Sequence, residues 1–156
     1  MKKISKIKKL KIPPPIVTII FATFMLLLNL GSNFHIDIPG NDLLVVICAI
    51  IASLLLFPAV VQFYRSKTTV NPLKPETAKV LVVKGVYRFS RNPMYLGMAL
   101  ALLAWGIYLS NPLNLFIFIA YIAYMNHFQI KFEEEALTKI FGNEYALYMQ
   151  RVRRWL

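Results

Sequence analysis

The sequence predicts an all-α membrane protein with four transmembrane helices in a single domain, residues 1–156. Hydrophobic residues make up 58% of the chain and charged residues only 16%, with a mean hydropathy of +0.56, against ~45–50% and ~25% in soluble globular proteins. A helix needs about 20 apolar residues, with a range of roughly 17–25, to cross a bilayer. Four stretches without Lys, Arg, Asp or Glu reach or approach that length, at residues 16–34, 43–64, 93–110 and 113–129.

The positive charge lies on one side of these stretches. All 18 Lys and Arg residues fall within 2–11, 65–91 or 131–154, and none falls in the 31–42 loop or the 110–113 turn. The positive-inside rule then places both termini and the loop 65–92 in the cytoplasm, with four crossings between them. The net charge of +11 is therefore a topology signal and an attraction to anionic lipid, and we expect no nucleic-acid partner.

The chain begins with a Lys-rich segment followed by an apolar run, a pattern that a secretory signal shares. The apolar run is longer than such a signal needs and no small-x-small cleavage site follows, so we expect it to be retained as the first helix. The last two spans are separated only by Asn111 and Pro112. This spacing predicts a helical hairpin with a tight turn at the far membrane face.

The loop 65–92 is 28 residues long, which makes it either functional or disordered. Its apolar residues favour order. It ends at Pro93, which suits the first turn of a helix because proline lacks only an N–H group that would be unpaired there. Such a helix start offers free N–H donors to a carboxylate or hydroxyl. A positively charged anchor at the membrane interface gives the same pattern, so both interpretations stay open at this point.

Three consecutive acids, residues 133–135, follow the fourth span. The last of them precedes Lys139 by four residues, a spacing that supports an exposed helix. Adjacent carboxylates beside a membrane repel one another and need a compensating cation. Because a hairpin brings the start of the third helix and the end of the fourth to one membrane face, we expect Arg91 and Tyr95 to line a cytoplasmic pocket with the first two acids.

The tail predicts two amphipathic C-terminal helices. Leu137 and Phe141 lie on one apolar face, Gly142 is expected to end that helix, and Tyr145 and Tyr148 restart the same period. The tail either completes the predicted pocket or lies on the membrane surface. In the second interpretation its arginines face lipid phosphates; they are Arg151, Arg153 and Arg154.

Two classes of site are excluded. Cys48 is the single cysteine, so the chain has no intramolecular disulfide and no multi-cysteine metal site. The six glycines never form G-x-G-x-x-G, so the soluble dinucleotide-binding fingerprint is absent. We expect no metal site, and a nucleotide-like cofactor would have to be bound by membrane helices and the tail.

From Thr68 to about Val152 the residues resemble integral-membrane methyltransferases of the isoprenylcysteine carboxyl methyltransferase type, with relatives among phospholipid methyltransferases. Three motifs carry the resemblance. They are Thr68-Thr69-Val70-x-Pro72, Gly85-x-Tyr87-x-x-x-Arg91-x-Pro93-x-Tyr95-x-Gly97 and Glu133-Glu134-x-x-Leu137-x-x-x-Phe141-Gly142-x-x-Tyr145-x-x-Tyr148.

The resemblance implies S-adenosyl-L-methionine as methyl donor, bound at a cytoplasmic loop, and a lipophilic small-molecule or lipidated acceptor that arrives from the bilayer. Arg91 and Glu134 are the implied catalytic residues. The implied cofactor-binding residues are Gly85, Val86, Tyr87, Arg91, Asn92, Pro93, Tyr95, Glu133 and Glu134.

The sequence departs from the family pattern twice. Asn92 stands where the family often has histidine, and Gln129 stands where a basic residue is frequent. Asparagine keeps hydrogen-bonding groups for a cofactor but has no titrating group. Three functions therefore stay open, namely carboxyl O-methylation of a lipophilic acceptor, N-methylation of a phospholipid, and a non-catalytic accessory role on the same scaffold. The sequence does not predict the oligomeric state.

Overall fold

The computed structural model describes residues 12–36, 39–66 and 80–156, and within these residues the protein is helical without strands. The Lys-rich start and the motif from Thr68 to Pro72 lie outside the described residues. Each predicted apolar stretch coincides with a helix. These helices are α1 (Pro14–Gly31), α2 (Asn41–Arg65), α3 (Pro93–Tyr108) and α4 (Asn114–Tyr124).

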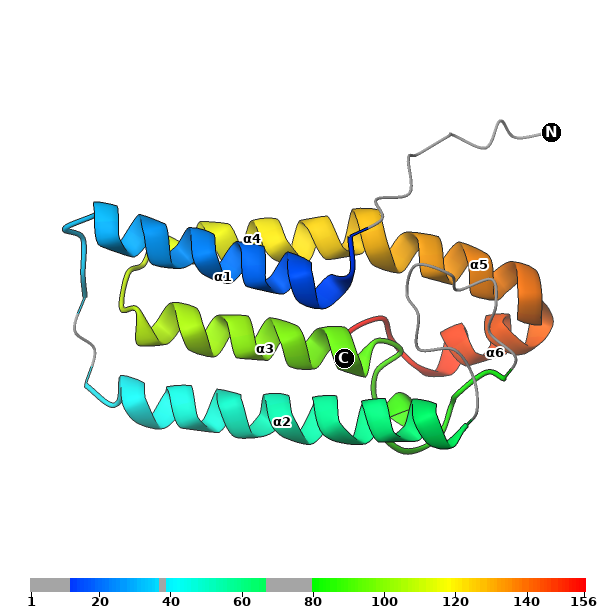
Figure 1. Cartoon of the computed structure of the whole chain (residues 1–156). Coiled ribbons are helices and arrows are strands. Elements are labelled where there is room, and N and C mark those ends of the chain that lie inside the picture. The colour runs from blue at the N-terminus through cyan, green and yellow to red at the C-terminus, as the bar shows by residue number, and fades with distance from the viewer. Residues whose placement is uncertain (1–11, 37–38, 67–79) are drawn as a thin grey trace.

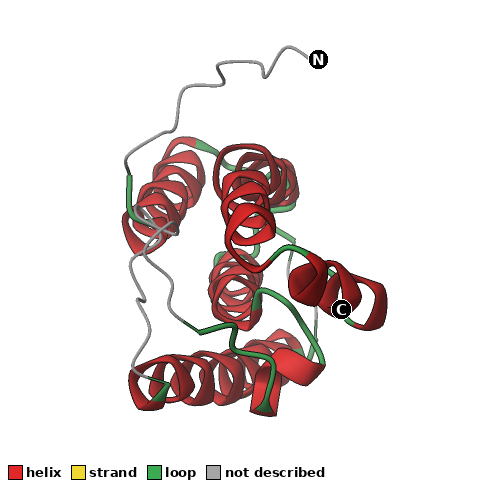
Figure 2. Cartoon of the chain, turned by 90° about the vertical axis from the view of Figure 1, so that its right-hand side faces the viewer, coloured by secondary structure: helices red, strands yellow, loops and turns green. Residues whose placement is uncertain are grey.

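Helix α3 occupies the centre of the bundle, with α2 on one side and α1 and α4 on the other (Figures 1 and 2). The contact between α2 and α3 depends on Gly97. A Cβ atom there would lie 2.6 Å from Leu56 Cγ and 3.0 Å from the Ala52 carbonyl oxygen. Small residues are the usual means by which membrane helices approach closely, so this glycine sets the α2–α3 distance.

Two polar contacts fix α1 on its neighbours. The hydroxyls of Thr18 and Tyr121 lie 3.0 Å apart, and Trp105 Nε1 donates to the Ala22 carbonyl oxygen at 3.1 Å. Polar groups in a water-poor interior are costly unless they are hydrogen-bonded. The apolar core surrounds these contacts; its buried members include Val17, Met25, Ala99, Leu102, Tyr121 and Met125.

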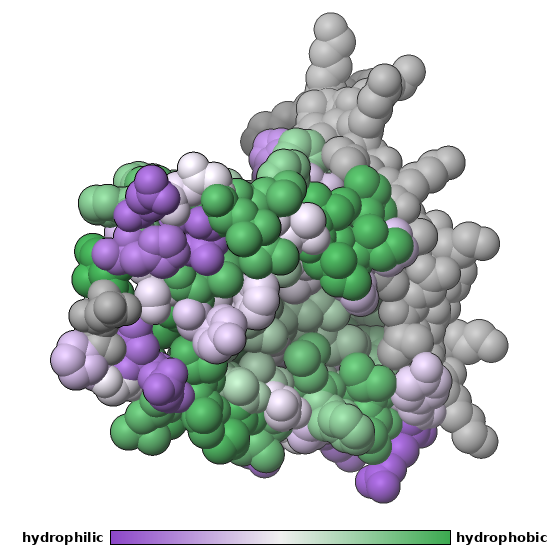
Figure 3. Space-filling model, turned by 60° about the vertical axis from the view of Figure 1, so that its left-hand side comes forward, coloured by the Kyte–Doolittle hydropathy of each residue, from purple (hydrophilic) through white to green (hydrophobic). Residues whose placement is uncertain are grey.

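The outer surfaces of the helices are apolar, as the green face in Figure 3 shows. Three helices are long and apolar enough to cross a membrane, namely α1, α2 and the continuous helix Asn114–Phe141. The chain is therefore an integral membrane protein. Four crossings were predicted, but α3 has only 16 residues, about 24 Å at 1.5 Å per residue. Its crossing stays a prediction.

The predicted hairpin of the third and fourth helices is present, because α4 begins shortly after α3 ends and runs back beside it (Figure 1). The fourth helix does not end near residue 129. It passes through a π-helical segment, η3 (Met125–Ile130), and continues as α5 (Lys131–Phe141). Gly142, with φ +51°, ends α5 as predicted, and α6 (Asn143–Arg151) turns back toward the bundle.

The segments that carry the predicted site residues lie at one end of the bundle. The start of α1, the end of α2, the start of α3 and both C-terminal helices lie there, at the right of Figure 1. The α1–α2 link and the α3–α4 turn lie at the opposite end. Polar and charged residues that are far apart in the sequence are therefore close to one another at this end of the bundle.

Candidate functional site

The centre of the site is an ion pair between Arg91 and Glu134. Arg91 precedes α3 by two residues, and Glu134 lies in the first turn of α5. Arg91 Nη2 donates to Glu134 Oε1 at 2.8 Å, and the two side chains are only 11% and 14% exposed. Charge-assisted hydrogen bonds of this kind are stronger than neutral ones. The pairing of the hairpin ends that the sequence predicts is therefore present.

A second arginine, Arg154, reaches the same carboxylate. Its Nη2 donates to Glu134 Oε2 at 2.5 Å and its Nε to Oε1 at 3.1 Å. The hydrogen bond to Glu134 raises the pKa of Arg154. The interpretation of Arg154 as a lipid-facing residue is wrong, because α6 runs back from Gly142 and carries the tail into the site. Arg151 and Arg153 are exposed.

The neighbouring acid, Glu133, is held by neutral donors. Tyr95 Oη donates to Glu133 Oε1, and Gln129 Nε2 donates to the same oxygen at 2.9 Å. Tyr95 and Gln129 are 8% and 6% exposed. The two consecutive acids therefore have different partners, since Glu134 lies between two cations whereas Glu133 accepts from a phenol and an amide.

Main-chain atoms of the tail hold the segment before α3 in place. The Arg91 N–H donates to the Arg153 carbonyl oxygen at 3.0 Å, and Asn92 Nδ2 donates to the Arg154 carbonyl oxygen at 3.0 Å. Ser90, which is 1% exposed, accepts from the Asn92 N–H through its Oγ at 3.1 Å. Asn92, where the resemblance expects histidine, thus fixes the C-terminal segment to the start of α3.

The glycine motif forms a 3₁₀ turn, η2 (Gly85–Arg88), against α2. Gly85 has φ +59°, and a Cβ atom there would collide with the Gln62 side chain, so the turn requires glycine at this position. Tyr87 is buried beside Phe63, with ring centroids 5.3 Å apart. Val86 packs into the same cluster.

Helix α6 connects this turn to the charged site. Tyr148 Oη donates to the Tyr87 carbonyl oxygen at 2.6 Å. Tyr145, Tyr148 and Val152 form a buried cluster against Leu81 and Val83. Burial raises the pKa of Tyr145 and raises that of Tyr148 to about 12. The apolar face of α6 therefore covers the loop before α3 rather than a membrane surface.

The structure brings most of the predicted site residues to one place. Arg91, Asn92, Pro93 and Tyr95 surround the start of α3, and both acids reach them from α5. The residues Gly85, Val86 and Tyr87 lie against α2, and Tyr148 of α6 connects their turn to the rest of the site.

Sequence reasoning missed two further contributors besides Arg154. Trp155 Nε1 donates to Asn126 Oδ1 at 3.0 Å, and Arg154 Nη1 lies 3.5 Å from the same oxygen. Asn126 lies in the π-helical segment η3, and such segments occur frequently at functional sites. A polar residue inside an otherwise apolar run was the available signal.

Two buried polar atoms at the site have no hydrogen-bond partner among the described residues. They are Arg91 Nε and Tyr87 Oη. The large majority of buried polar groups in proteins have a hydrogen-bond partner. Each atom can still donate a hydrogen bond, so the site has unused hydrogen-bonding capacity.

Comparisons with known proteins identify the family. Residues 42–144 match the family described as phospholipid methyltransferase. The chain is 49% identical to an uncharacterized protein of Haemophilus influenzae over 63 residues, 40% of this chain and all of that protein. It is 39% identical to a protein-S-isoprenylcysteine O-methyltransferase of Saccharomyces cerevisiae over 79 residues, 51% of this chain and 33% of the relative.

A third relative extends the comparison. Protein-S-isoprenylcysteine O-methyltransferase B of Arabidopsis thaliana is 30% identical over 103 residues, 66% of this chain and 52% of the relative. The chain thus spans a third to about half of the length of these two methyltransferases. The matched residues 42–144 include the glycine turn, Arg91, Tyr95 and both acids. This protein belongs to the phospholipid methyltransferase family.

Proposed function

We propose that the protein is an S-adenosyl-L-methionine-dependent methyltransferase that acts on a lipophilic acceptor at the cytoplasmic membrane interface. The observation that carries the proposal is the Arg91–Glu134–Arg154 cluster, formed at one end of an apolar helical bundle. The yeast and Arabidopsis relatives are named isoprenylcysteine O-methyltransferases. These names favour a carboxylate as the methyl-accepting group.

The residues of the site fit the proposed cofactor chemically. S-Adenosylmethionine carries a carboxylate, an ammonium group and ribose hydroxyls. Arg91 and Arg154 are suited to the carboxylate, because a guanidinium recognises it through two parallel hydrogen bonds. Glu133 and Glu134 are suited to the ammonium group or the hydroxyls. The unpaired Arg91 Nε and Tyr87 Oη supply further hydrogen-bonding capacity. Asn92 holds the C-terminal segment, and Tyr95 holds the Glu133 side chain.

The cofactor would supply a methyl group bonded to a positively charged sulfur, which an oxygen or nitrogen nucleophile displaces in line. For such a reaction the protein mainly needs to align the reactants, an effect worth up to ~7–11 kcal/mol. The Glu133 and Glu134 carboxylates are each restrained by more than one hydrogen bond. Arg91 and Glu134 are the groups we assign to the contact with cofactor or acceptor.

Membrane topology completes the proposal. We infer four crossings, with both termini and the site in the cytoplasm. The basic residues within the described segments, at 65, 84–91 and 131–154, belong to elements at the end of the bundle that holds the site, as the positive-inside rule requires. Because α3 is about 24 Å long, the site would lie near the membrane–water boundary, where a soluble cofactor and a lipid-borne acceptor meet.

Binding of S-adenosylhomocysteine to the detergent-purified protein tests the proposal. A ligand at a hundredfold excess over its Kd stabilises the folded protein by about 2.7 kcal/mol, so we expect a clear rise in the thermal unfolding temperature. Arg91→Ala and Glu134→Gln should reduce the rise strongly. Glu135→Gln, at an exposed neighbouring position, is the matched control and should retain it. No stabilisation of the parent by millimolar ligand would contradict the proposal.

A second candidate acceptor follows from the matched family description, phospholipid methyltransferase. An ethanolamine headgroup offers an amine in place of a carboxylate. Transfer of labelled methyl from S-adenosylmethionine to either a prenylcysteine or phosphatidylethanolamine in mixed micelles separates the two. We expect the prenylcysteine to be methylated. Methylation of phosphatidylethanolamine alone would reassign the acceptor and leave the cofactor proposal intact.

A further inference from the structure

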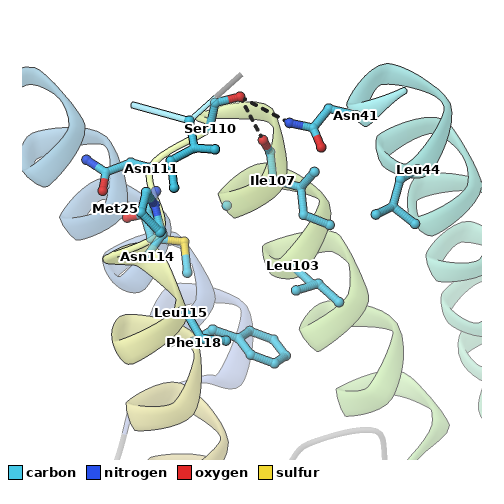
Figure 4. Close-up of a pocket in the computed structure, with 13 residues that line it drawn as sticks. Met25, Asn41, Leu44, Leu103, Ile107, Ser110, Asn111, Asn114, Leu115 and Phe118 are labelled. Atoms are coloured by element: carbon cyan, nitrogen blue, oxygen red, sulfur yellow. Dashed lines mark hydrogen bonds between the residues drawn. The ribbon is translucent and has the colours of Figure 1, made fainter. Parts of the chain in front are cut away.

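A cavity of about 240 Å³ lies at the end of the bundle opposite the Arg91–Glu134 pair. It is bounded by α1, α2, α3 and α4 next to the α3–α4 turn (Figure 4). Most of its wall is apolar, with Leu44 contributed by α2, Leu103 by α3 and Phe118 by α4. The methyltransferase proposal assigns no role to this cavity.

The polar end of the cavity contains an unpaired amide. Asn114 is 2% exposed, and neither its Nδ2 nor its Oδ1 has a partner among the described residues. Asn111 is 3% exposed; its Oδ1 accepts from the Leu113 N–H at 3.1 Å, but its Nδ2 is unpaired. Leaving a buried amide without partners destabilises a protein. The two side chains therefore offer both donors and an acceptor to a bound molecule.

The turn beside these amides is strained. Ser110 has φ +51°, the only positive φ of a non-glycine residue in the described part of the chain, and it accepts a hydrogen bond from Asn41 Nδ2 at 3.4 Å. Backbone strain of this kind clusters at binding sites. Among the described residues that line the cavity, none is charged, which favours an uncharged ligand.

Water alone is a poor occupant. A volume of about 240 Å³ has room for several waters, and each buried water needs about three hydrogen bonds. The few polar groups at one end cannot supply them. A hydrocarbon chain matches the apolar wall, and a hydroxyl group, which both donates and accepts, matches the Asn114 amide.

We propose that this cavity binds a bilayer lipid with an uncharged, hydroxyl-bearing head. The hydroxyl group pairs with Asn114, and the hydrocarbon chain lies along Leu103 and Phe118. The surrounding helix surfaces are themselves apolar and exposed, so lipid is the solvent next to the cavity. The site is separate from the proposed methyl-transfer site, since α3 spans about 24 Å between them.

Thermal unfolding of the detergent-purified protein with 1-monooleoylglycerol tests this inference. We expect the lipid to raise the unfolding temperature of the parent, and methyl oleate, which has the chain but no donor, to raise it much less. Asn114→Leu should weaken binding about tenfold while unfolding at the same or a higher temperature without lipid, because the buried amide is removed. The matched control is Asn33→Leu at an exposed position near the same end.

A second variant keeps the test decisive if Asn114→Leu folds poorly. Leu44 is 47% exposed, so Leu44→Trp can enter the cavity from α2 with little effect on packing, and it should also reduce lipid binding. Equal stabilisation of parent and Asn114→Leu, or no stabilisation of the parent, would overturn the inference. The measurement of lipid binding needs no methyl donor, and Glu134→Gln should bind the lipid like the parent. A negative result for lipid binding can therefore be distinguished from a negative result for the proposed methyltransferase function.

Discussion

Arg154 and Glu134 form a two-pronged ion pair, with Nη2–Oε2 at 2.5 Å and Nε–Oε1 at 3.1 Å. The pair joins the C-terminal segment to α5 at the carboxylate that also binds Arg91. Twenty residues separate the two partners in sequence, and only the reversal at Gly142 brings them together. The tail is consequently a structural part of the site.

Replacement of Arg154 should weaken ligand binding more than it weakens the fold. The Arg154 side chain is 38% exposed, so solvent screening limits its contribution to stability to about 1 kcal/mol or less. Glu134 would keep only one cation, and we expect Arg154→Met to bind S-adenosylhomocysteine about tenfold more weakly by titration calorimetry. Arg153→Met, at an exposed position, serves as the control. Equal affinities of the two variants would refute a role for Arg154.

Tyr95→Phe should destabilise the site. The change removes the hydrogen bond that the buried Tyr95 donates to Glu133, and a hydrogen bond to a carboxylate contributes about 1.5–3 kcal/mol to stability. Thermal unfolding and S-adenosylhomocysteine titration should both show the loss. Tyr108→Phe, on the exposed end of the same helix, should behave like the parent. A Tyr95→Phe variant that matches the parent in both measurements would show that the phenol is dispensable.

Gly97→Ala should separate α2 from α3. The added methyl group would lie 2.6 Å from Leu56 Cγ and 3.0 Å from the Ala52 carbonyl oxygen, and overpacking of this kind costs about 1–3 kcal/mol. Gly106→Ala on the same helix is the matched control, because its Cβ atom would meet neighbours no closer than 3.6 Å. Denaturant unfolding in detergent measures both, and equal stabilities would contradict the packing argument.

Alkaline pH should loosen α6. Burial raises the pKa of Tyr148 from 10.0 to about 12, so the folded protein holds this proton more tightly than the unfolded chain. The associated stability is complete below pH 10 and is lost as the pH rises through 12. The fall in unfolding temperature across this range should be shallower for Tyr148→Phe than for the parent. Identical pH profiles would show that Tyr148 does not titrate in this way.

Chemical labelling of single introduced cysteines tests the membrane topology. Cys48 is the only cysteine, so Cys48→Ala gives a cysteine-free background. In sealed, right-side-out vesicles, a membrane-impermeant maleimide should label Asn33→Cys and leave Lys139→Cys unlabelled, because the two exposed positions lie at opposite ends of the bundle. Detergent should expose both. Labelling of both in intact vesicles would contradict the four-crossing arrangement.

Much of the bundle follows from the sequence. The uncharged stretches mark the helices because a membrane interior tolerates few charges, and the two-residue Asn111-Pro112 separation forces the hairpin. From the hairpin alone, Arg91 and Tyr95 are expected near the acids, and the structure places them there. The functional roles of these residues remain proposals.

Other features depend on tertiary contacts that periodicity does not encode. Arg154 belongs to a basic tail that resembles a lipid-facing segment, and only the packing of Tyr145 and Tyr148 against the preceding loop directs it inward. The distal cavity was not predicted either. Its signal was a lone polar residue, Asn114, at the start of an apolar run, which indicated only an uncertain helix end.

The π-helical turns at Met125–Ile130 set the rotational phase between the two halves of one long helix. The first half presents Tyr121 to the apolar core, whereas the second presents Glu134 to Arg91 and Arg154 and Glu133 to Tyr95. Deleting one residue between them would rotate the acids by about 100° relative to the core-facing side. This short segment therefore allows one continuous helix to pack against the apolar core along its first half and to contribute acids to the charged site along its second half.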